Sequence, residues 1–317
     1  MSAAASPSLG YREYKVGWIC ALRSERIAAM SMLDERYDDP DSQHELDDNE
    51  YVLGCVGKYK VAIASLPPGQ PGTHNAAIVA TEMKYTFHNI KFFLMVGIAG
   101  GIPSDHDVRL GDVVVSIPGK KSMGVVQPDF GTMTEELQHT HVLHGPPRYL
   151  LNVIMKVQSE HEFGKSRVSD NISTMFEKHP TLIAKYTHPG PENDQLFKAD
   201  YEHSGGPTCA QCDDSMLVVR PPRLDNRPKV HYGTVLSANH VMRNAAKRDV
   251  LGKEYDALCF EMESGGLMNT FPCLVIRGIC DYADSHKDKR WQEYAAVAAA
   301  AYAKEFISYV TPKAVEG

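Results

Sequence analysis

The chain has 317 residues, of which 43% are hydrophobic, and a formal net charge of −7. Its length allows a sizeable hydrophobic core, and no apolar run reaches the roughly 20 residues that a membrane helix needs. The negative charge disfavours a nucleic-acid-binding surface. The seven cysteines are scattered, and several lie within apolar runs, which is typical of reduced thiols rather than a disulfide framework. We therefore expect a cytoplasmic protein that binds neither membrane nor nucleic acid.

The start of the chain is predicted to pass from a strand into a helix. Residues 1–13 have the composition of a flexible lead-in and lack the charged and apolar regions of a secretory signal. We expect a strand over residues 14–22, a helix capped by Ser24, and an acidic surface loop over residues 34–50. Glu25 then lies in the first turn of a helix that directly follows a strand.

Glycines follow the strand that is predicted at residues 92–96. The run Gly97-Ile98-Ala99-Gly100-Gly101 favours a loop whose backbone approaches a ligand, because glycine has no side chain; a plain tight turn is the alternative. Other strands are expected at 51–55, 59–65, 110–116, 124–131 and 230–236, and helices from 75 onward and at 146–157, 181–186, 237–251 (capped by Ser237 or Asn239) and 291–310.

The strongest chemical signal lies between residues 256 and 284. A short apolar run, Ala257 to Phe260, precedes Glu261 and Glu263, and a second apolar run ends at Asp281. A short helix is predicted between them, which gives a β-α-β unit with carboxylates at the exits of two adjacent parallel strands. Ligands of open α/β sheets bind outside those carboxyl ends. The unit therefore predicts a binding site that contains these acids.

The alternation of strands and helices predicts a single α/β domain over residues 14–313. We expect a three-layer αβα sandwich around a mixed, largely parallel sheet. Residues 187–227 are rich in proline, glycine and charge, which predicts an irregular excursion or a covering segment.

Three ordered motifs resemble the nucleoside phosphorylase / methylthioadenosine nucleosidase superfamily. They are KVGWICALRSE at 15–25, VGIAGG at 96–101, and FEMES at 260–264 followed by IRGICDYAD at 276–284. More closely, the chain looks like the fungal branch that forms the N-terminal domain of NACHT- or repeat-containing receptor-like proteins. The resemblance implies that family's fold, and the stretch from 137 to 229 does not match the bacterial enzymes.

The resemblance implies a role for each of three acids. Glu25 takes the position of the nucleosidases' water-activating glutamate, Glu263 would hold the ribose hydroxyls, and Asp281 would protonate N7 of the purine. Without the resemblance, an ordinary first-turn glutamate, a helix cap and a turn residue are the alternatives. The other implied pocket residues are Met262, Gly97, Ile98, Ala99, Val241, Met242, Ser237, Asn239 (where the nucleosidases carry aspartate) and Glu261, for which capping of the following helix is the favoured interpretation.

The nucleophile distinguishes the two reactions of the family. Phosphorylases hold phosphate with arginines and a hydroxyl in the glycine loop, whereas this chain has Met95 and Ile98 at those positions. Isoleucine donates no hydrogen bond to a dianion, and an adjacent Glu25 would repel it. We therefore expect water as the nucleophile, with Arg23, Arg109 and Arg277 as the phosphate ligands of the phosphorylase alternative.

The predicted function is that of a purine nucleoside N-ribohydrolase acting on adenosine-, inosine- or guanosine-type nucleosides. A purine nucleoside phosphorylase and a non-catalytic nucleoside sensor are the alternatives. The resemblance implies a homo-oligomer, in the first place a dimer, and no organic cofactor. Cys209 and Cys212 form a Cys-x-x-Cys pair, for which His203 or the group His139, His141 and His144 could complete a zinc site. Because a closed zinc site needs four ligands, we expect no metal.

Overall fold

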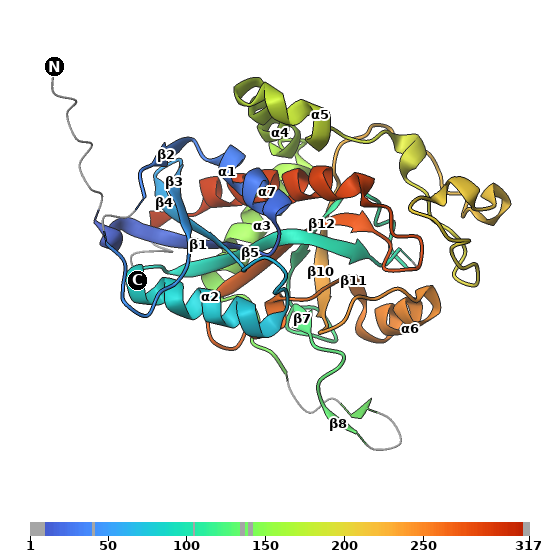
Figure 1. Cartoon of the computed structure of the whole chain (residues 1–317), viewed down its shortest axis with the longest axis horizontal. Helices are drawn as coiled ribbons and strands as arrows, with labels where there is room; N and C mark the ends of the chain where they lie inside the picture. Colours follow the sequence, from blue (N-terminus) through green and yellow to red (C-terminus); the bar gives the residue numbers. More distant parts are fainter. Residues whose placement is uncertain (1–9, 40–41, 104, 134–136, 139–141, 313–317) are drawn as a thin grey trace.

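The computed structural model describes residues 10–39, 42–103, 105–133, 137–138 and 142–312 (Figure 1). Most of the lead-in predicted at 1–13 lies outside these residues, and Tyr11–Glu13 forms a 3-10 turn. The helices are α1 (Arg23–Met32), α2 (Thr73–Thr86), α3 (Arg148–Glu162), α4 (Val168–Lys178), α5 (Ile183–Tyr186), α6 (Ala245–Tyr255) and α7 (Gln292–Tyr309). The strands are β1 (Tyr14–Cys20), β2 (Glu35–Tyr37), β3 (Tyr51–Val56), β4 (Tyr59–Ser65), β5 (Phe92–Gly101), β6 (Val113–Ser116), β7 (Val125–Val126), β8 (Thr132–Met133), β9 (Leu137–Gln138), β10 (Val230–Ser237), β11 (Ala257–Glu261) and β12 (Cys273–Asp281).

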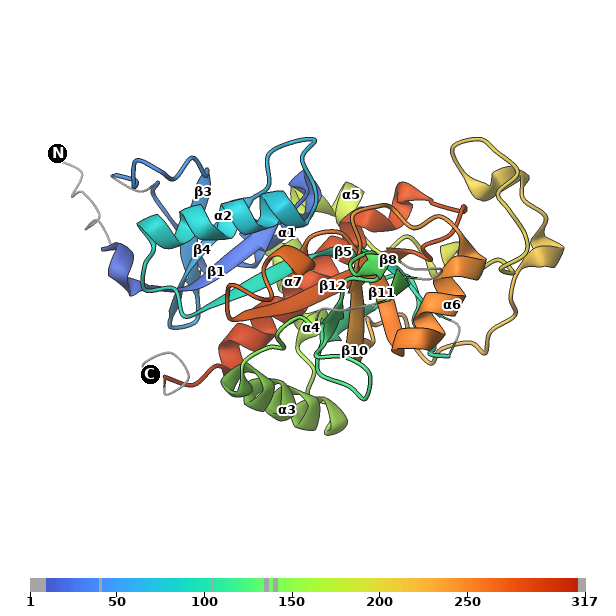
Figure 2. The ribbon, with the colours of Figure 1, turned by 90° about the horizontal axis from the view of Figure 1, so that it is seen from below.

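A mixed sheet forms the middle layer, with strand order β11-β10-β6-β12-β5-β1-β4-β3-β2. Strands β12, β5, β1 and β4 are parallel, whereas β6 runs antiparallel to β12, and β10 and β11 are parallel to β6. Helices α1, α4 and α7 cover one face, and α2 and α6 lie on the other side (Figures 1 and 2). The expected three-layer αβα sandwich with a mixed sheet is confirmed.

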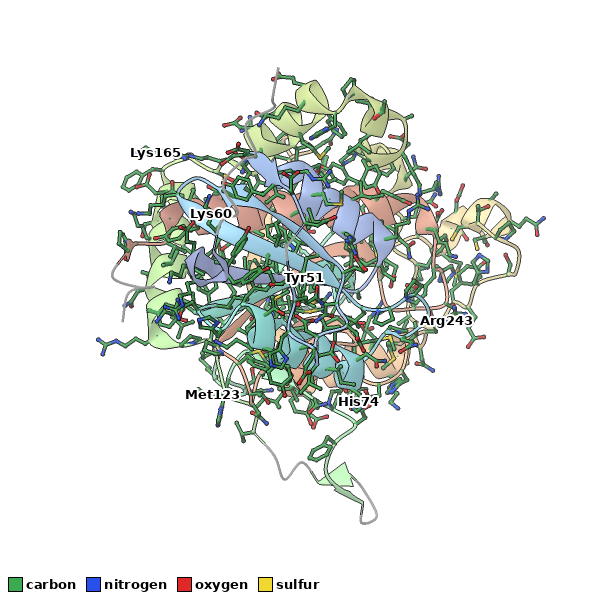
Figure 3. All side chains as sticks on the ribbon, turned by 60° about the vertical axis from the view of Figure 1, so that its left-hand side comes forward. Tyr51, Lys60, His74, Met123, Lys165 and Arg243 are labelled. Atoms are coloured by element: carbon green, nitrogen blue, oxygen red, sulfur yellow. The ribbon has the colours of Figure 1, made fainter. Side chains whose placement is uncertain are left out.

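Apolar side chains of the sheet form the core on both faces. Trp18 and Leu94 pack with the alanine-rich inner face of α7, and Phe93 packs with Met83 of α2. Side chains fill the space between the layers; Tyr51 lies in the interior, whereas Lys165 is at the periphery (Figure 3). In the part of the chain that the structure describes, no helix is long and apolar enough to cross a bilayer.

The β-α-β prediction around residues 256–284 is wrong in two respects. Strands β11 and β12 are not neighbours, since β10 and β6 lie between them in the sheet. Their connection also contains only a 3-10 turn, Ser264–Gly266, because Gly266 packs directly on the backbone of α2: a side chain there would meet the Thr73 carbonyl oxygen at 1.9 Å.

Strand β5 brings the ends of β11 and β12 together instead. Its Gly100 pairs with Asp281 of β12 in parallel and with Phe260 of β11 in antiparallel register. The glycine run is therefore part of a ten-residue strand and not a loop. A Cβ atom on Gly100 would lie 2.7 Å from the Asp281 carboxylate, so glycine permits this convergence.

Several element boundaries also differ from the predictions. Helix α6 begins at Ala245, where the Asn244 side chain accepts a hydrogen bond from the Lys247 amide, and neither Ser237 nor Asn239 caps it. Strand β2 forms within the predicted acidic loop by pairing with β3. Helix α4 was not predicted. The excursion at 187–227 contains only 3-10 turns and an isolated bridge between Phe197 and Leu217.

Candidate active site

A cavity of about 240 Å³ lies where β1, β5, β11 and β12 end. Glu25, Glu263 and Asp281 all line it, so the structure brings together the three acids that the sequence singles out. A larger cavity of about 410 Å³ lies beneath residues 187–227 and is lined by none of these acids. We therefore build the site from the smaller cavity.

Glu25 is held by backbone amides from the connection between β1 and α1 and from strand β5. Its Oε2 accepts hydrogen bonds from the Ala21 and Leu22 amides at 2.7 and 2.9 Å, and its Oε1 accepts one from the Ile98 amide at 2.8 Å. Glu25 thus caps α1 by reaching back, and the predicted cap Ser24 lies inside the helix. Burial raises the pKa of Glu25, although the charge of Arg277 and these amides oppose the shift.

Arg277 lies behind Glu25, fully buried in β12. A Cβ atom on Gly97 would sit 2.4 Å from both Arg277 Nη1 and Glu25 Oε1, so these two atoms flank the Gly97 backbone. Among the described residues, Arg277 Nη1 and Nε have no hydrogen-bond partner. Because Arg277 is not among the residues that line the cavity, it acts on the Glu25 carboxylate through its positive charge.

Arg277 also binds the two glutamates at the end of β11. Its Nη2 donates to Glu261 and, at 3.2 Å, to Glu263 Oε2. Glu261 accepts further hydrogen bonds from the Ser264 hydroxyl and amide at the start of the 3-10 turn, where the predicted helix does not form. Although burial favours the neutral acid, Arg277 and the Ser264 contacts lower the pKa of Glu261.

Glu263 has the opposite electrostatic balance. Burial raises its pKa to about 7, because the charge of Arg277 compensates only in part and Glu261 and Glu25 add repulsion. The Glu263 carboxylate accepts a hydrogen bond from Arg277, and a backbone hydrogen bond from Met262 also opposes the rise in its pKa. Glu263 therefore has acceptor capacity left for a ligand in the cavity.

Asp281 uses its two oxygens differently. Its Oδ1 accepts hydrogen bonds from the Ala283 amide and from Lys287 Nζ, both at 2.8 Å. Its Oδ2 has only the Cys280 thiol nearby, at 3.3 Å. One oxygen of Asp281 is therefore anchored, and the other is available to a ligand.

The other predicted pocket residues divide into two groups. Met262, Ile98, Ala99, Val241, Met242 and Glu261 line the cavity, whereas Gly97, Ser237 and Asn239 do not. Ser237 is buried and accepts a hydrogen bond from the Gly265 amide, and Asn239 is exposed and bonded to Thr73 and Asp129. Sequence reasoning missed Phe260, Cys280, Lys287 and His240 as lining residues, since only the fold brings their segments to the cavity.

The arginines named as phosphate ligands are not in the cavity wall. Arg277 is committed to two glutamates, and Arg109 binds Asp107 and the Pro221 carbonyl under the excursion. Among the described lining residues, Lys287 is the one lysine or arginine, and it is paired with Asp281. Among the described residues that line the cavity, no arginine or lysine is therefore free to bind an incoming phosphate.

A family model described as the phosphorylase superfamily matches residues 15–310. The chain belongs to the phosphorylase superfamily. A nucleotide-binding leucine-rich repeat (NLR)-like protein of Hyaloscypha variabilis is 42% identical over 99% of the chain, and the chain spans 31% of that relative's length. The expected fungal branch is thereby confirmed.

Other members of the superfamily share its fold at lower identity. A 5'-methylthioadenosine/S-adenosylhomocysteine nucleosidase of Mycobacterium bovis is 22% identical over 91% of this chain and 94% of its own. The structure of futalosine hydrolase from Helicobacter pylori superposes with a TM-score of 0.60 at 15% identity, covering 94% of this chain and 99% of that one. A Helicobacter pylori 5'-methylthioadenosine/S-adenosyl homocysteine nucleosidase, solved with a pyrrolidine ligand, gives the same TM-score and identity over 95% and 99%.

Proposed function

We propose that this chain is a purine nucleoside N-ribohydrolase, which cleaves the N-glycosidic bond with water. The observation that carries the proposal is the convergence of Glu25, Glu263 and Asp281 on one cavity whose described wall has no unpaired lysine or arginine. The named nucleosidase and hydrolase relatives support hydrolysis of an N-glycosidic bond. The purine nucleoside as substrate follows from the resemblance of the motifs.

The proposed reaction assigns one task to each acid. Glu25 accepts a proton from a water in the cavity, and the resulting hydroxyl adds to C1′ of the ribose. The C1′–N9 bond breaks, its electron pair passes to the base, and Asp281 gives a proton to N7 through its free Oδ2. Glu263 accepts hydrogen bonds from the ribose hydroxyls and stabilises the cationic sugar. The products are the free base and ribose.

A phosphate nucleophile would need positively charged side chains in the lining of the cavity. A buried dianion is stabilised by bidentate arginine contacts, and Glu25 would lie against it. The same sugar and base contacts could nevertheless serve a phosphorylase, so the choice of nucleophile is the point to test.

One assay separates the candidate functions. The chain is incubated with adenosine, inosine and guanosine, with and without phosphate, and the sugar product is identified. We expect free ribose at the same rate in both conditions. Ribose 1-phosphate that forms only with phosphate would establish a phosphorylase instead, and binding without any product would establish a sensor. Light scattering on the same preparation tests the dimer that we propose from the resemblance.

A further inference from the structure

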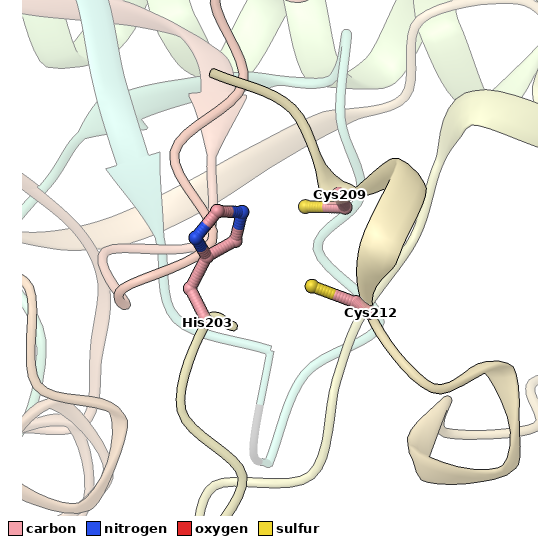
Figure 4. A group of neighbouring side chains, drawn as sticks. All are labelled: His203, Cys209 and Cys212. Atoms are coloured by element: carbon pink, nitrogen blue, oxygen red, sulfur yellow. The ribbon is translucent and has the colours of Figure 1, made fainter. Parts of the chain in front are cut away.

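Three metal-ligating side chains meet in the excursion at residues 187–227. Ligand atoms of His203, Cys209 and Cys212 all lie within 4.8 Å of one another. The two sulfur atoms project from one 3-10 turn, Cys209–Gln211, toward the imidazole of His203, which comes from a separate part of the loop (Figure 4). The sequence offered His203 as one candidate ligand beside the Cys-x-x-Cys pair, and the fold places it there, whereas His139 and His141 lie outside the described residues.

The geometry is close to that of a tetrahedral zinc site. Zinc binds sulfur at about 2.3 Å and imidazole nitrogen at about 2.0–2.1 Å, which places its ligand atoms about 3.5–3.8 Å apart. Because the ligand atoms all lie within 4.8 Å of one another, the group needs to contract by no more than about 1.3 Å to reach those separations. Both thiols are free, and both are only partly exposed. The His203 imidazole donates from Nε2 to the Thr208 carbonyl and accepts at Nδ1 from the Gly205 amide, and it would exchange one of these hydrogen bonds for the ion.

A second observation comes from the neighbouring His286. Its side chain is 3% exposed, and its Nε2 has no hydrogen-bond partner among the described residues. The ring centroid lies 5.5 Å from that of His203, and His286 lines the same small cavity as Cys209. His286 is outside the group of three ligands, but its buried nitrogen without a partner opens the way to a ligand or water in the cavity that it shares with Cys209.

The excursion also lacks the usual source of stability. Of residues 187–227, all of which the structure describes, only Leu196 and Phe197 are buried. Regular secondary structure in this segment is limited to 3-10 turns. A segment with so small an apolar core needs a cross-link, and a structural metal is one that small folds use.

We propose that His203, Cys209 and Cys212 bind one structural zinc ion, with His286 or a water at the fourth position. Binding converts both thiols to thiolates and releases two protons. The His203 amide donates to the Ser285 hydroxyl at 3.0 Å, and Cys209 lines a cavity with Asp281. The ion would therefore fasten the excursion to the segment that carries Asp281 and Lys287.

The test measures metal content and coordination in the full chain. Protein purified in reducing buffer is incubated with zinc sulfate, freed of excess metal and analysed by mass spectrometry. We expect about one zinc per chain in the parent and in Cys55→Ser, which removes a partly exposed thiol on β3. We expect less than a tenth of that in the double variant Cys209→Ser/Cys212→Ser and in His203→Ala. Cobalt substitution should give thiolate-to-cobalt absorption in the parent and in Cys55→Ser, and none in the double variant.

A measurement on the parent alone covers the case in which a variant fails to fold. Chelator should lower the melting temperature of the parent, and added zinc should restore it. The proposal is overturned if the folded parent retains no zinc although a thiol assay shows that Cys209 and Cys212 are both reduced. It is equally overturned if Cys209 and Cys212 form a disulfide, or if the double variant keeps the metal.

Discussion

At Glu25, one buried carboxylate both caps a helix and faces the cavity. The two uses are compatible because each oxygen has its own donors: Ala21 and Leu22 bind Oε2, and Ile98 binds Oε1. The backbone therefore fixes the carboxylate before any ligand arrives. Such preorganisation is what a positioned general base requires.

Replacing the carboxylates of Glu25 and Asp281 by amides tests their proposed tasks. We expect Glu25→Gln and Asp281→Asn each to lower kcat at least about a hundredfold. A side-chain amide can neither take up the proton of the water nor transfer a proton to N7. Steady-state ribose release measures the effect, with Glu35→Gln on the exposed strand β2 as the control. Near-native turnover in either variant would remove that residue from the mechanism.

The Glu263 carboxyl predicts how stability depends on pH. Burial raises its pKa from 4.5 to about 7, so between these values the folded chain holds a proton that the unfolded chain has released. The free energy of unfolding therefore falls as pH rises through this window. At about 1.4 kcal/mol per pKa unit, the loss is at most about 3–4 kcal/mol.

Glu263→Gln should remove this part of the pH dependence. Denaturant unfolding at pH 5 and pH 8 should show a smaller decrease in the variant than in the parent, whereas Glu177→Gln, on the exposed side of α4, should behave as the parent does. An unchanged decrease in Glu263→Gln would show that other groups cause it.

At the scale of elements, β5 is the strand that assembles the site. It pairs with β1, β12 and β11, so Glu25, Asp281 and the β11 glutamates are all positioned against one strand. Gly97 and Gly100 allow this, because neighbouring side chains occupy the volume that a Cβ atom would need. The glycines serve packing within a strand rather than loop flexibility.

Gly97→Ala tests the packing at this crossing. The added methyl group would overlap the Glu25 and Arg277 side chains, which their own partners hold in place. We expect a loss of about 1–3 kcal/mol in stability and at least about a hundredfold in kcat. Gly119→Ala is the matched control, since its Cβ atom would meet nothing closer than 4.0 Å. Equal activity in the two variants would contradict the account.

At the scale of the whole molecule, a buried aspartate ties the excursion to the sheet. Asp112 accepts hydrogen bonds from Arg223 Nη1 and Nη2 at 2.5 and 2.7 Å and from His231 Nε2 at 2.8 Å. Burial alone would raise the pKa of Asp112, but Arg223 and His231 hold it below its usual value. The excursion therefore supplies, through Arg223, the positive charge that stabilises the buried carboxylate of Asp112.

Removing that charge should destabilise the whole domain. We expect Arg223→Met to cost about 2 kcal/mol in the free energy of unfolding, because it leaves a buried carboxylate short of donors. Arg227→Met, in the same segment, breaks an exposed pair with Asp225 and should change stability by less than about 0.5 kcal/mol. Denaturant unfolding of both variants measures the difference, and equal stabilities would show that Asp112 does not depend on Arg223.

The sequence by itself determined the fold class, the family and the three acids at strand ends. Apolar runs followed by Glu25, Glu263 and Asp281 are local signals, and the strand-helix alternation requires no knowledge of contacts. Local patterns predicted the wrong caps for α1 and α6 and a helix after Glu263 that does not form. The side chains of Glu25 and Asn244 bind backbone amides at the starts of α1 and α6 instead, and Gly266 packs against the backbone of α2.

Only the tertiary structure decided how those acids meet and what stands beside them. Strand order depends on contacts between distant residues, so the pairing of β11 with β5 through Gly100 could not be predicted from the sequence. The same is true of the ion pairs of Arg277 with two glutamates and of Lys287 with Asp281. The tertiary structure also brings His203, one of the histidines named from the sequence, to Cys209 and Cys212, because the irregular segment folds back on itself.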